Sequence, residues 1–322
     1  MPEPKVPRFL QTWLADADAE RDAARAALLA SPASVAPKFF YDRLGSHLFE
    51  AITELAEYYP TRTEGGIFAA HGSAMAQAVG SGMALIDLGA GNCAKAASLF
   101  PLLEPSRYIA VDISVEFLRE ALRELQREQP QIAMAGLGQD FSSALDIPAD
   151  LTGEDRPVFF YPGSSIGNFT ADQALVFLRR VRARAAGGGL LIGVDLVKSK
   201  AVLEAAYDDS LGVTAAFNRN ALSHLNRLIG SDFAPRQWRH VAFFAEAQSR
   251  IEMHLEAREA IAVTWPGGAR RFAAGERIHT ENSCKYTVEG FRTMLLDAGF
   301  GTPRHWTDRR DWFAVFWAPV GR

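Results

Sequence analysis

Two glycines follow a short apolar run and turn the chain out of it. Residues 83–88 are largely apolar and lead directly into Gly89-Ala90-Gly91-Asn92, after which a helical pattern begins. Glycine adopts backbone conformations that are closed to other residues, so such a turn lets a ligand approach the main chain closely. An ordinary tight strand-to-helix turn would explain the same residues, so the turn alone is weak evidence of a binding site.

Acidic residues follow the next two strand candidates and strengthen that evidence. Asp112 ends the run 107–112, at the distance of about 20 residues where a carboxylate accepts hydrogen bonds from ribose hydroxyls. Asp140 and Phe141 follow the run 132–137, and a polar group beside an aromatic ring suits an adenine. This order resembles class I methyltransferases more than nicotinamide-dependent dehydrogenases, whose glycine fingerprint would place its third glycine at Ala94.

Strand and helix patterns alternate through the middle of the chain. The expected strands are 83–88, 107–112, 132–137, 158–163 and 190–196, and the expected helices are 94–103, 114–128 and 171–186. Such alternation predicts an α/β fold with a mostly parallel sheet and helices on both of its faces. Ligands of such sheets bind beyond the carboxyl ends of the strands, where the acidic and glycine motifs fall.

The remaining segments indicate a second, smaller region. Helices are expected at 8–31, 44–57, 198–229 and 287–299, short antiparallel strands at 241–244, 251–255 and 261–265, and a closing strand at 312–317. We therefore expect a Rossmann-like, class I methyltransferase domain from residues 80–195 plus 286–322. Residues 1–79 plus 196–285 would form a substrate-binding region.

The composition argues against several other functions. The net charge is −4, from 34 basic and 38 acidic residues without a long basic run, so nucleic acid is not expected as a partner. No apolar run approaches the roughly 20 residues that span a bilayer, and the N-terminus has no signal-peptide pattern, so we expect a cytoplasmic protein without a membrane partner. Cys93 and Cys284 lack the spacing of a zinc site, and no metal is expected. We also expect a monomer.

Four sequence strings resemble the histidine-specific methyltransferase family. The resemblance covers the chain from about residue 35 onwards, and its strings are Phe39-Phe40-Tyr41-Asp42 with Gly45-Ser46 and Leu48-Phe49, Glu57-Tyr58-Tyr59-Pro60-Thr61-Arg62-Thr63-Glu64, Gly163-Ser164-Ser165-Ile166-Gly167-Asn168-Phe169, and Glu281-Asn282-Ser283-Cys284-Lys285-Tyr286. Members of that family use S-adenosylmethionine to make trimethylhistidine (hercynine) on the route to ergothioneine. The resemblance thus implies methylation of the α-amino group of L-histidine, with histidine as a small-molecule substrate.

The resemblance also implies roles for individual residues. Tyr41 would lie near the reacting amine, and Asn168 with Tyr207 would hold the α-amino and carboxylate end of the substrate, which makes Tyr41 and Asn168 the candidate catalytic residues. Tyr58 would reach the imidazole region, Glu281 and Ser283 would bind the ring, and Met253 would line that side of the pocket. The cofactor contacts would be Gly89, Gly91, Lys95, Asp112, Asp140 and Phe141. The segment Asn92-Cys93-Ala94-Lys95 departs from commoner family versions, which carry more hydroxyl and acidic residues there.

The implied reaction is direct displacement at the sulfonium methyl by the neutral α-amine, repeated three times. It depends on alignment of the reacting atoms, and aromatic faces can stabilise the growing positive charge. Three alternatives stay open: the same chemistry on another free amino acid or a histidine derivative, a nicotinamide-dependent oxidoreductase, and a non-catalytic protein that binds these ligands.

Overall fold

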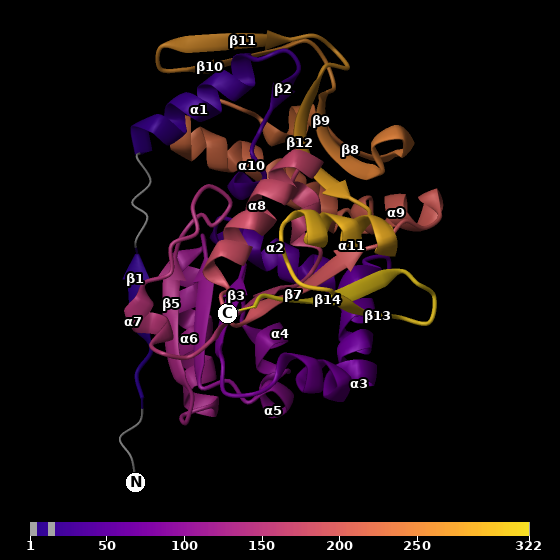
Figure 1. The fold of residues 1–322 in the computed structure, drawn as a ribbon. Helices are drawn as coiled ribbons and strands as arrows, with labels where there is room; N and C mark the ends of the chain where they lie inside the picture. Colours follow the sequence, from indigo (N-terminus) through magenta and orange to yellow (C-terminus); the bar gives the residue numbers. More distant parts are fainter. Residues whose placement is uncertain (1–4, 12–16, 322) are drawn as a thin grey trace. The chain divides into compact units, whose positions relative to one another are not determined.

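The computed structural model describes residues 5–11 and 17–321, which form two compact units (Figure 1). Unit 1 contains the described residues of Met1–Trp13 together with Pro60–Val197 and Lys285–Arg322. Unit 2 contains the described residues of Leu14–Tyr59 together with Lys198–Cys284.

An eight-stranded sheet forms the centre of unit 1, in the order β1-β5-β4-β3-β6-β7-β14-β13. Neighbouring strands from β1 to β7 pair in parallel, whereas β14 runs antiparallel to both β7 and β13. The strands are β1 (Arg8–Gln11), β3 (Ala84–Leu88), β4 (Arg107–Asp112), β5 (Ala133–Gly138), β6 (Pro157–Tyr161), β7 (Gly189–Asp195), β13 (Arg304–Thr307) and β14 (Phe313–Pro319). This order confirms the predicted α/β fold with a mostly parallel sheet. The order reverses between β3 and β6, and such a switch point is where open α/β sheets bind ligands.

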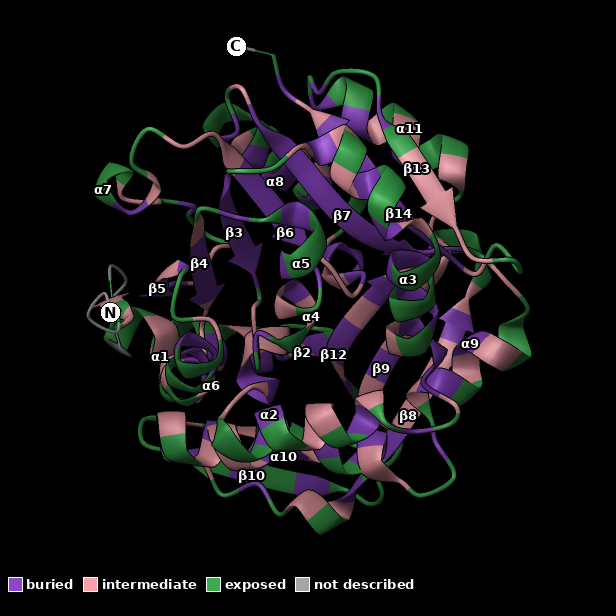
Figure 2. Cartoon of the chain, turned by 90° about the horizontal axis from the view of Figure 1, so that it is seen from below, coloured by how far each residue is buried: buried purple, intermediate pink, exposed green. Residues whose placement is uncertain are grey.

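Helices cover both faces of this sheet because alternate side chains of each strand point to opposite sides. Ile86 of β3 packs on the side of α8 and α11, whereas Leu85 packs on the side of α3 and α6. Figure 2 shows the central strands β3, β6 and β7 as buried. The helices of unit 1 are α3 (Tyr59–Val79), α4 (Ala94–Ala97), α5 (Phe100–Leu103), α6 (Val115–Glu128), α7 (Ala149–Thr152), the 3-10 helix η2 (Ser165–Asn168), α8 (Ala171–Arg184) and α11 (Val288–Asp297).

Unit 2 is built on a four-stranded sheet in the order β2-β12-β9-β8. Its strands are β2 (Ala33–Ser34), β8 (Trp238–Ala245), β9 (Arg250–Ala257) and β12 (Arg277–Cys284), and the hairpin β10 (Ile261–Trp265) and β11 (Gly268–Phe272) forms a separate pair. The central pairs β8–β9 and β9–β12 are antiparallel. The helices are α1 (Ala17–Leu29), η1 (Pro37–Phe40), α2 (Arg43–Thr53), α9 (Lys200–Tyr207), α10 (Val213–Ile229), η3 (Pro235–Gln237) and η4 (Glu246–Gln248).

One carboxylate fixes the start of α2 and joins it to α10. Asp42 caps α2 by accepting a hydrogen bond from the Gly45 N–H at 2.7 Å. The same Oδ1 accepts from Asn220 Nδ2 at 2.7 Å, and Arg227 binds the other oxygen. The Phe39-Phe40-Tyr41 string is thereby held against α10, where Phe40 contacts Phe217 with ring centroids 4.8 Å apart.

The structure corrects two expectations at the N-terminal side. A helix over residues 8–31 was expected, but residues 8–11 form β1 and pair in parallel with β5, and the helix begins at Ala17; residues 12–16 lie outside the described part. Helix α3 was not expected, because small residues such as Gly65 and Gly66 obscure its periodicity. Its residues Ile67 and Phe68 pack on the unit 1 sheet, so residues 60–79 belong to unit 1, whereas they were expected to join residues 196–285.

Two further helical segments are divided. The expected helix 94–103 consists of α4 and α5, and the expected helical stretch 198–229 consists of α9 and α10. Asp209 explains the second division, because its carboxylate accepts hydrogen bonds from the N–H groups of Val213 and Thr214 and so starts a new helix.

Candidate active site

The glycine turn after β3 lies at the switch point of the unit 1 sheet. Gly89 and Gly91 have φ values of 75° and 52°, which favour glycine. The Gly91 N–H donates to Asp112 Oδ2 at 2.9 Å, and the Ser114 N–H donates to Asp112 Oδ1 at 2.8 Å. Asp112 therefore ties the end of β3 to the end of β4. Burial raises the pKa of Asp112, although the hydrogen bonds from Ser114 and Gly91 oppose that rise.

Phe141 lies beside the same turn. A Cβ atom placed on Gly89 would lie 3.8 Å from Phe141 Cζ, so the turn and the ring are direct neighbours. The ring is held edge-on to Tyr161, with centroids 5.6 Å apart. Asp140, just before it, accepts hydrogen bonds from the N–H of Ser142 at 3.0 Å and from its hydroxyl. The structure thus brings the predicted residues Gly89, Gly91, Asp112 and Phe141 together at the carboxyl ends of β3, β4 and β5.

Lys95 is paired with a buried carboxylate that the sequence reasoning did not assign. Glu64 of α3 is fully buried and lies 2.5 Å from Lys95 Nζ. Its two oxygens also accept from the Gly163 N–H, at 3.0 and 3.1 Å. A side chain at Gly193 of β7 would collide with Glu64, since its Cβ would lie 1.9 Å from Oε1. Glu64 therefore connects α3, α4 and the loop after β6. The only sequence signal for this residue was its place in the string Glu57–Glu64, which resembles the family.

A second buried acid lies within β3 itself. Asp87 accepts a hydrogen bond from the Tyr108 hydroxyl at 2.8 Å, and its other carboxylate oxygen is buried without a hydrogen-bond partner. Burial raises the pKa of Asp87 to about 7, although Tyr108 and Lys95 oppose the rise. Burial also raises the pKa of Cys93 to about 12, so this thiol stays protonated and packs as a small core residue.

Asn168 ends the 3-10 helix η2, which follows β6 on the other side of the switch point. This loop is anchored to β7 because the Asp195 N–H donates to Ser164 Oγ at 2.8 Å. A buried ion pair lies next to the anchor, with Lys285 Nζ 2.8 Å from Asp195 Oδ2. Asn168 is half-buried in unit 1, at the same sheet edge as the predicted cofactor contacts.

The other predicted substrate residues lie in unit 2, where they form a connected group. Tyr41 meets Phe49 edge-on at 5.8 Å between ring centroids, and Phe49 meets Tyr58 in the same way at 6.2 Å. Tyr58 in turn contacts the ring of Tyr207 at 6.3 Å. Helices α2 and α9 and the segments beside them thus supply a continuous series of aromatic rings.

The polar end of this group comes from β12 and β9. Tyr207 Oη and Ser283 Oγ are 2.6 Å apart in a hydrogen bond. Glu281 lies on the same strand as Ser283 and pairs with Met253 of β9 across the sheet. A register shift between His279 and Glu281 places Thr280 and Glu281 both in buried positions, and Glu281 is 8% exposed. The sequence reasoning did not predict β12 as a strand, although it identified Glu281 and Ser283.

Comparison with known proteins connects these two groups of residues with a family. The model of the histidine-specific, S-adenosylmethionine-dependent methyltransferases matches residues 20–320. The chain belongs to this family. A histidine N-alpha-methyltransferase of Mycolicibacterium smegmatis is 38% identical over 91% of this chain and 92% of its own length.

More distant relatives of this methyltransferase have other names. The N-methyltransferase imqF of Aspergillus flavus is 28% identical over 82% of this chain and 75% of its own length. Ergothioneine biosynthesis protein 1 of Neurospora crassa is 29% identical over 86% of this chain, which corresponds to only 32% of that longer protein.

Family membership confirms that the chain is a methyltransferase and that its cofactor is S-adenosylmethionine. It also decides against the nicotinamide-dependent oxidoreductase. The residues at the switch point fit this cofactor, because they combine glycine backbone, a half-buried acidic acceptor and an aromatic ring beside the turn. Among the described residues, no helix combines the length and the apolar character needed to cross a membrane.

Proposed function

We propose that this methyltransferase transfers methyl groups to the α-amino nitrogen of L-histidine, three times in succession, and so makes trimethylhistidine for ergothioneine biosynthesis. The observation that carries the proposal is the buried polar end of β12, where Glu281 and the hydrogen-bonded pair Tyr207–Ser283 lie at one end of an aromatic group. The similarity to a histidine N-alpha-methyltransferase and to an ergothioneine biosynthesis protein supports it.

Glu281 and Ser283 are proposed to select histidine by binding its imidazole nitrogens. An imidazole offers one donor and one acceptor when neutral, and the carboxylate and hydroxyl of these two residues can satisfy both. A substrate without ring nitrogens, such as phenylalanine, would leave the Glu281 carboxylate desolvated without that hydrogen bond. Sites built in this way reject analogues that lack the polar group.

Tyr41 and Tyr58 are proposed to favour the neutral amine and then to stabilise its methylated forms. A desolvated environment lowers the pKa of an ammonium group, which promotes loss of the proton that blocks attack. Ring faces also attract the fixed positive charge that grows with each methylation. Asn168 is proposed to hold the α-amino end, and Tyr207 the carboxylate end.

S-Adenosylmethionine supplies an electrophilic methyl group on a sulfonium. Gly89 and Gly91 are proposed to lie against the cofactor through their backbone, and Asp112 to accept hydrogen bonds from its ribose. Asp140, Phe141 and Lys95 are proposed to complete the contacts, with Lys95 oriented by Glu64. The chain's own contribution is thus binding and orientation, which can supply a large effective molarity.

We further infer a cytoplasmic setting and a monomeric enzyme. Both cysteines, Cys93 and Cys284, are free thiols in the structure, as is usual for proteins in a reducing compartment.

The proposal is tested by incubating the purified chain with S-adenosylmethionine and each of the twenty amino acids, and by measuring the product masses. We expect histidine alone to gain methyl groups, up to three. Methylation of another amino acid would keep the chemistry and overturn the roles of Glu281 and Ser283. No product with any of them would favour a modified substrate or a protein that binds these ligands without catalysis.

A further inference from the structure

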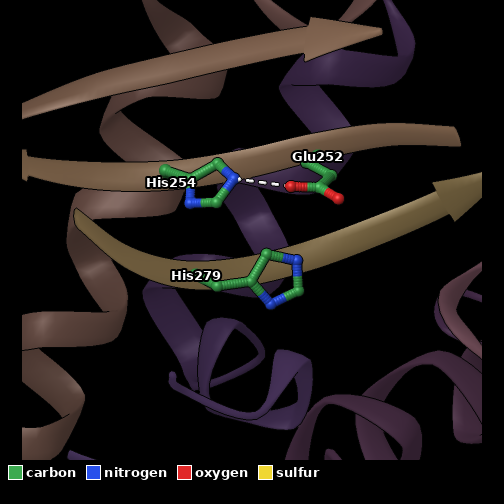
Figure 3. A group of neighbouring side chains, drawn as sticks. All are labelled: Glu252, His254 and His279. Carbon is green, nitrogen blue, oxygen red and sulfur yellow. Dashed lines mark hydrogen bonds and ion pairs between the residues drawn. The ribbon is translucent and has the colours of Figure 1, made fainter. Parts of the chain in front are cut away.

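Three potential metal ligands meet on the unit 2 sheet. Glu252 and His254 lie on β9, and His279 lies directly opposite His254 on β12. One ligand atom from each side chain lies within 4.8 Å of the other two. Figure 3 shows the three side chains turned toward one another.

These residues lie on the opposite face of the sheet from the proposed imidazole site. Along β9, Ile251, Met253 and Leu255 are buried, whereas Glu252 and His254 alternate with them and point to the other side. His279 likewise precedes the register shift of β12, so it shares the face of Glu252 and not that of Glu281. The proposed substrate-binding role of β12 therefore leaves this group unused.

Metals bind the neutral form of imidazole and the ionised form of a carboxyl group. Burial lowers the pKa values of His254 and His279, which keeps both imidazoles neutral. Burial opposes the ionisation of Glu252, but the hydrogen bonds from Arg250 and His254 outweigh it and lower the pKa of this carboxyl.

Only some of the potential ligand atoms are engaged in contacts outside this group. Arg250 binds Oε1 of Glu252, while Oε2 faces His254 Nε2 at 3.0 Å. The His254 ring stacks on Phe243 at 5.3 Å, and its Nδ1 is buried without a hydrogen-bond partner, which is unusual for a purely structural histidine. Asn282 Oδ1 lies 3.0 Å from His279 Nε2 and offers a fourth donor.

We propose that Glu252, His254 and His279 bind one divalent transition-metal ion of the zinc class, with Asn282 or water as the fourth ligand. Two histidines and one carboxylate with an open position are a common zinc ligand set. Ligand atoms at about 2.1 Å from a tetrahedral zinc are roughly 3.4 Å apart. Side-chain movements of up to roughly 1.4 Å would therefore bring the three ligand atoms, which lie within 4.8 Å of one another, to this spacing. Arg250 and Arg277 lie near this group and weaken the binding of any cation. The two imidazole ligands favour Zn²⁺ over Mg²⁺ or Ca²⁺, which prefer oxygen ligands.

The test is Zn²⁺ binding to the full chain, without a histidine tag and after removal of metals with a chelator, measured by isothermal titration calorimetry. We expect one Zn²⁺ per chain, at least tenfold weaker binding in His254→Gln and His279→Gln, and no comparable binding of Mg²⁺. His47→Gln is the matched control, because His47 forms an exposed surface pair with Glu50 at 3.2 Å. It should bind Zn²⁺ like the unmodified chain.

Absence of stoichiometric Zn²⁺ binding, or binding that His47→Gln weakens as much as His279→Gln, would overturn the proposal. The circular dichroism spectrum and melting temperature without metal show whether each variant folds. If a variant does not fold, anomalous scattering from crystals of the unmodified chain grown with Zn²⁺ decides: a zinc peak at Glu252, His254 and His279 supports the site, and a zinc peak only elsewhere refutes it. Because binding is measured without histidine or S-adenosylmethionine, its outcome is independent of the proposed methyltransferase substrate.

Discussion

Replacing Lys285 with methionine removes the ammonium group beside Asp195 and should destabilise the protein in a pH-dependent way. Both side chains of this ion pair are buried, with 0% and 1% exposure, and their charged atoms are 2.8 Å apart. Methionine keeps most of the volume of the lysine stem, so the main change is electrostatic. The Asp195 carboxyl then has either to stay charged in a buried position or to take up a proton.

Protonation sets an upper limit to the loss. An aspartate in the unfolded chain has a pKa of about 3.9, and one pKa unit corresponds to about 1.4 kcal/mol, so neutralising it at pH 7 costs roughly 4 kcal/mol. This value agrees with the usual cost of removing one partner from a buried ion pair, which is about 3–5 kcal/mol. At pH 5 the cost falls to roughly 1.5 kcal/mol, because a group whose pKa is raised by folding loses its stabilising effect as the pH increases.

Urea unfolding at pH 5 and pH 7 measures this difference. Lys200→Met is the control, because Lys200 is 55% exposed and its pairing with Glu204 is long, at 3.8 Å; it should change stability by about 0.5 kcal/mol or less. Adding Asp195→Asn to Lys285→Met should recover much of the loss at pH 7. A loss below about 1 kcal/mol at pH 7, or one that is equal at both pH values, would refute the reasoning.

Three further predictions concern the proposed site. Glu281→Gln should lower kcat/KM for histidine by roughly 5- to 150-fold, because a lost buried hydrogen bond costs about 1–3 kcal/mol. Calorimetry should find the affinity for S-adenosylmethionine unchanged, and an unchanged kcat/KM for histidine would contradict the proposed role of Glu281 in selectivity. Asp112→Asn should weaken S-adenosylmethionine binding about tenfold in calorimetry. The two carboxylate oxygens accept from the N–H groups of Gly91 and Ser114, whereas an asparagine amide has only one oxygen that can accept. An unchanged affinity would contradict this prediction. Asp87 has its pKa raised to about 7, so its contribution to stability is complete below pH 3.8 and is lost as the pH rises through about 7. Asp87→Asn should therefore flatten the dependence of the unfolding free energy between pH 5 and pH 8, and an unaltered slope would show that Asp87 does not titrate in this range.

The sheet of unit 1 could be predicted because local signals and tertiary structure agree there. Residues 107–112 are apolar, end in an acidic residue and form β4 with the same bounds. The glycine turn and Asp112 were identified from spacing alone, and the structure joins them by a hydrogen bond. Strand β12 was missed because its residues 279–283 are mostly polar, and its burial comes from the partner strand β9.

Other features depend on contacts between residues far apart in the chain. Glu64 is fully buried because Lys95 and the Gly163 N–H compensate its charge, and no local pattern in α3 reveals those partners. The strand β1 consists of only four residues, and its parallel pairing with β5 is a contact that helical periodicity cannot report. The roles of the individual site residues came from family resemblance, since tyrosines such as Tyr58 are equally common as packed aromatics.

The most direct test of the proposed function is to locate the methyl groups on the product. The purified chain is incubated with L-histidine and S-adenosylmethionine that carries a deuterated methyl group, and tandem mass spectrometry then separates fragments of the α-amino group from fragments of the ring. We predict three deuterated methyl groups on the α-nitrogen and none on the imidazole. Label on the imidazole nitrogens, or no labelled histidine at all, would contradict the proposed reaction.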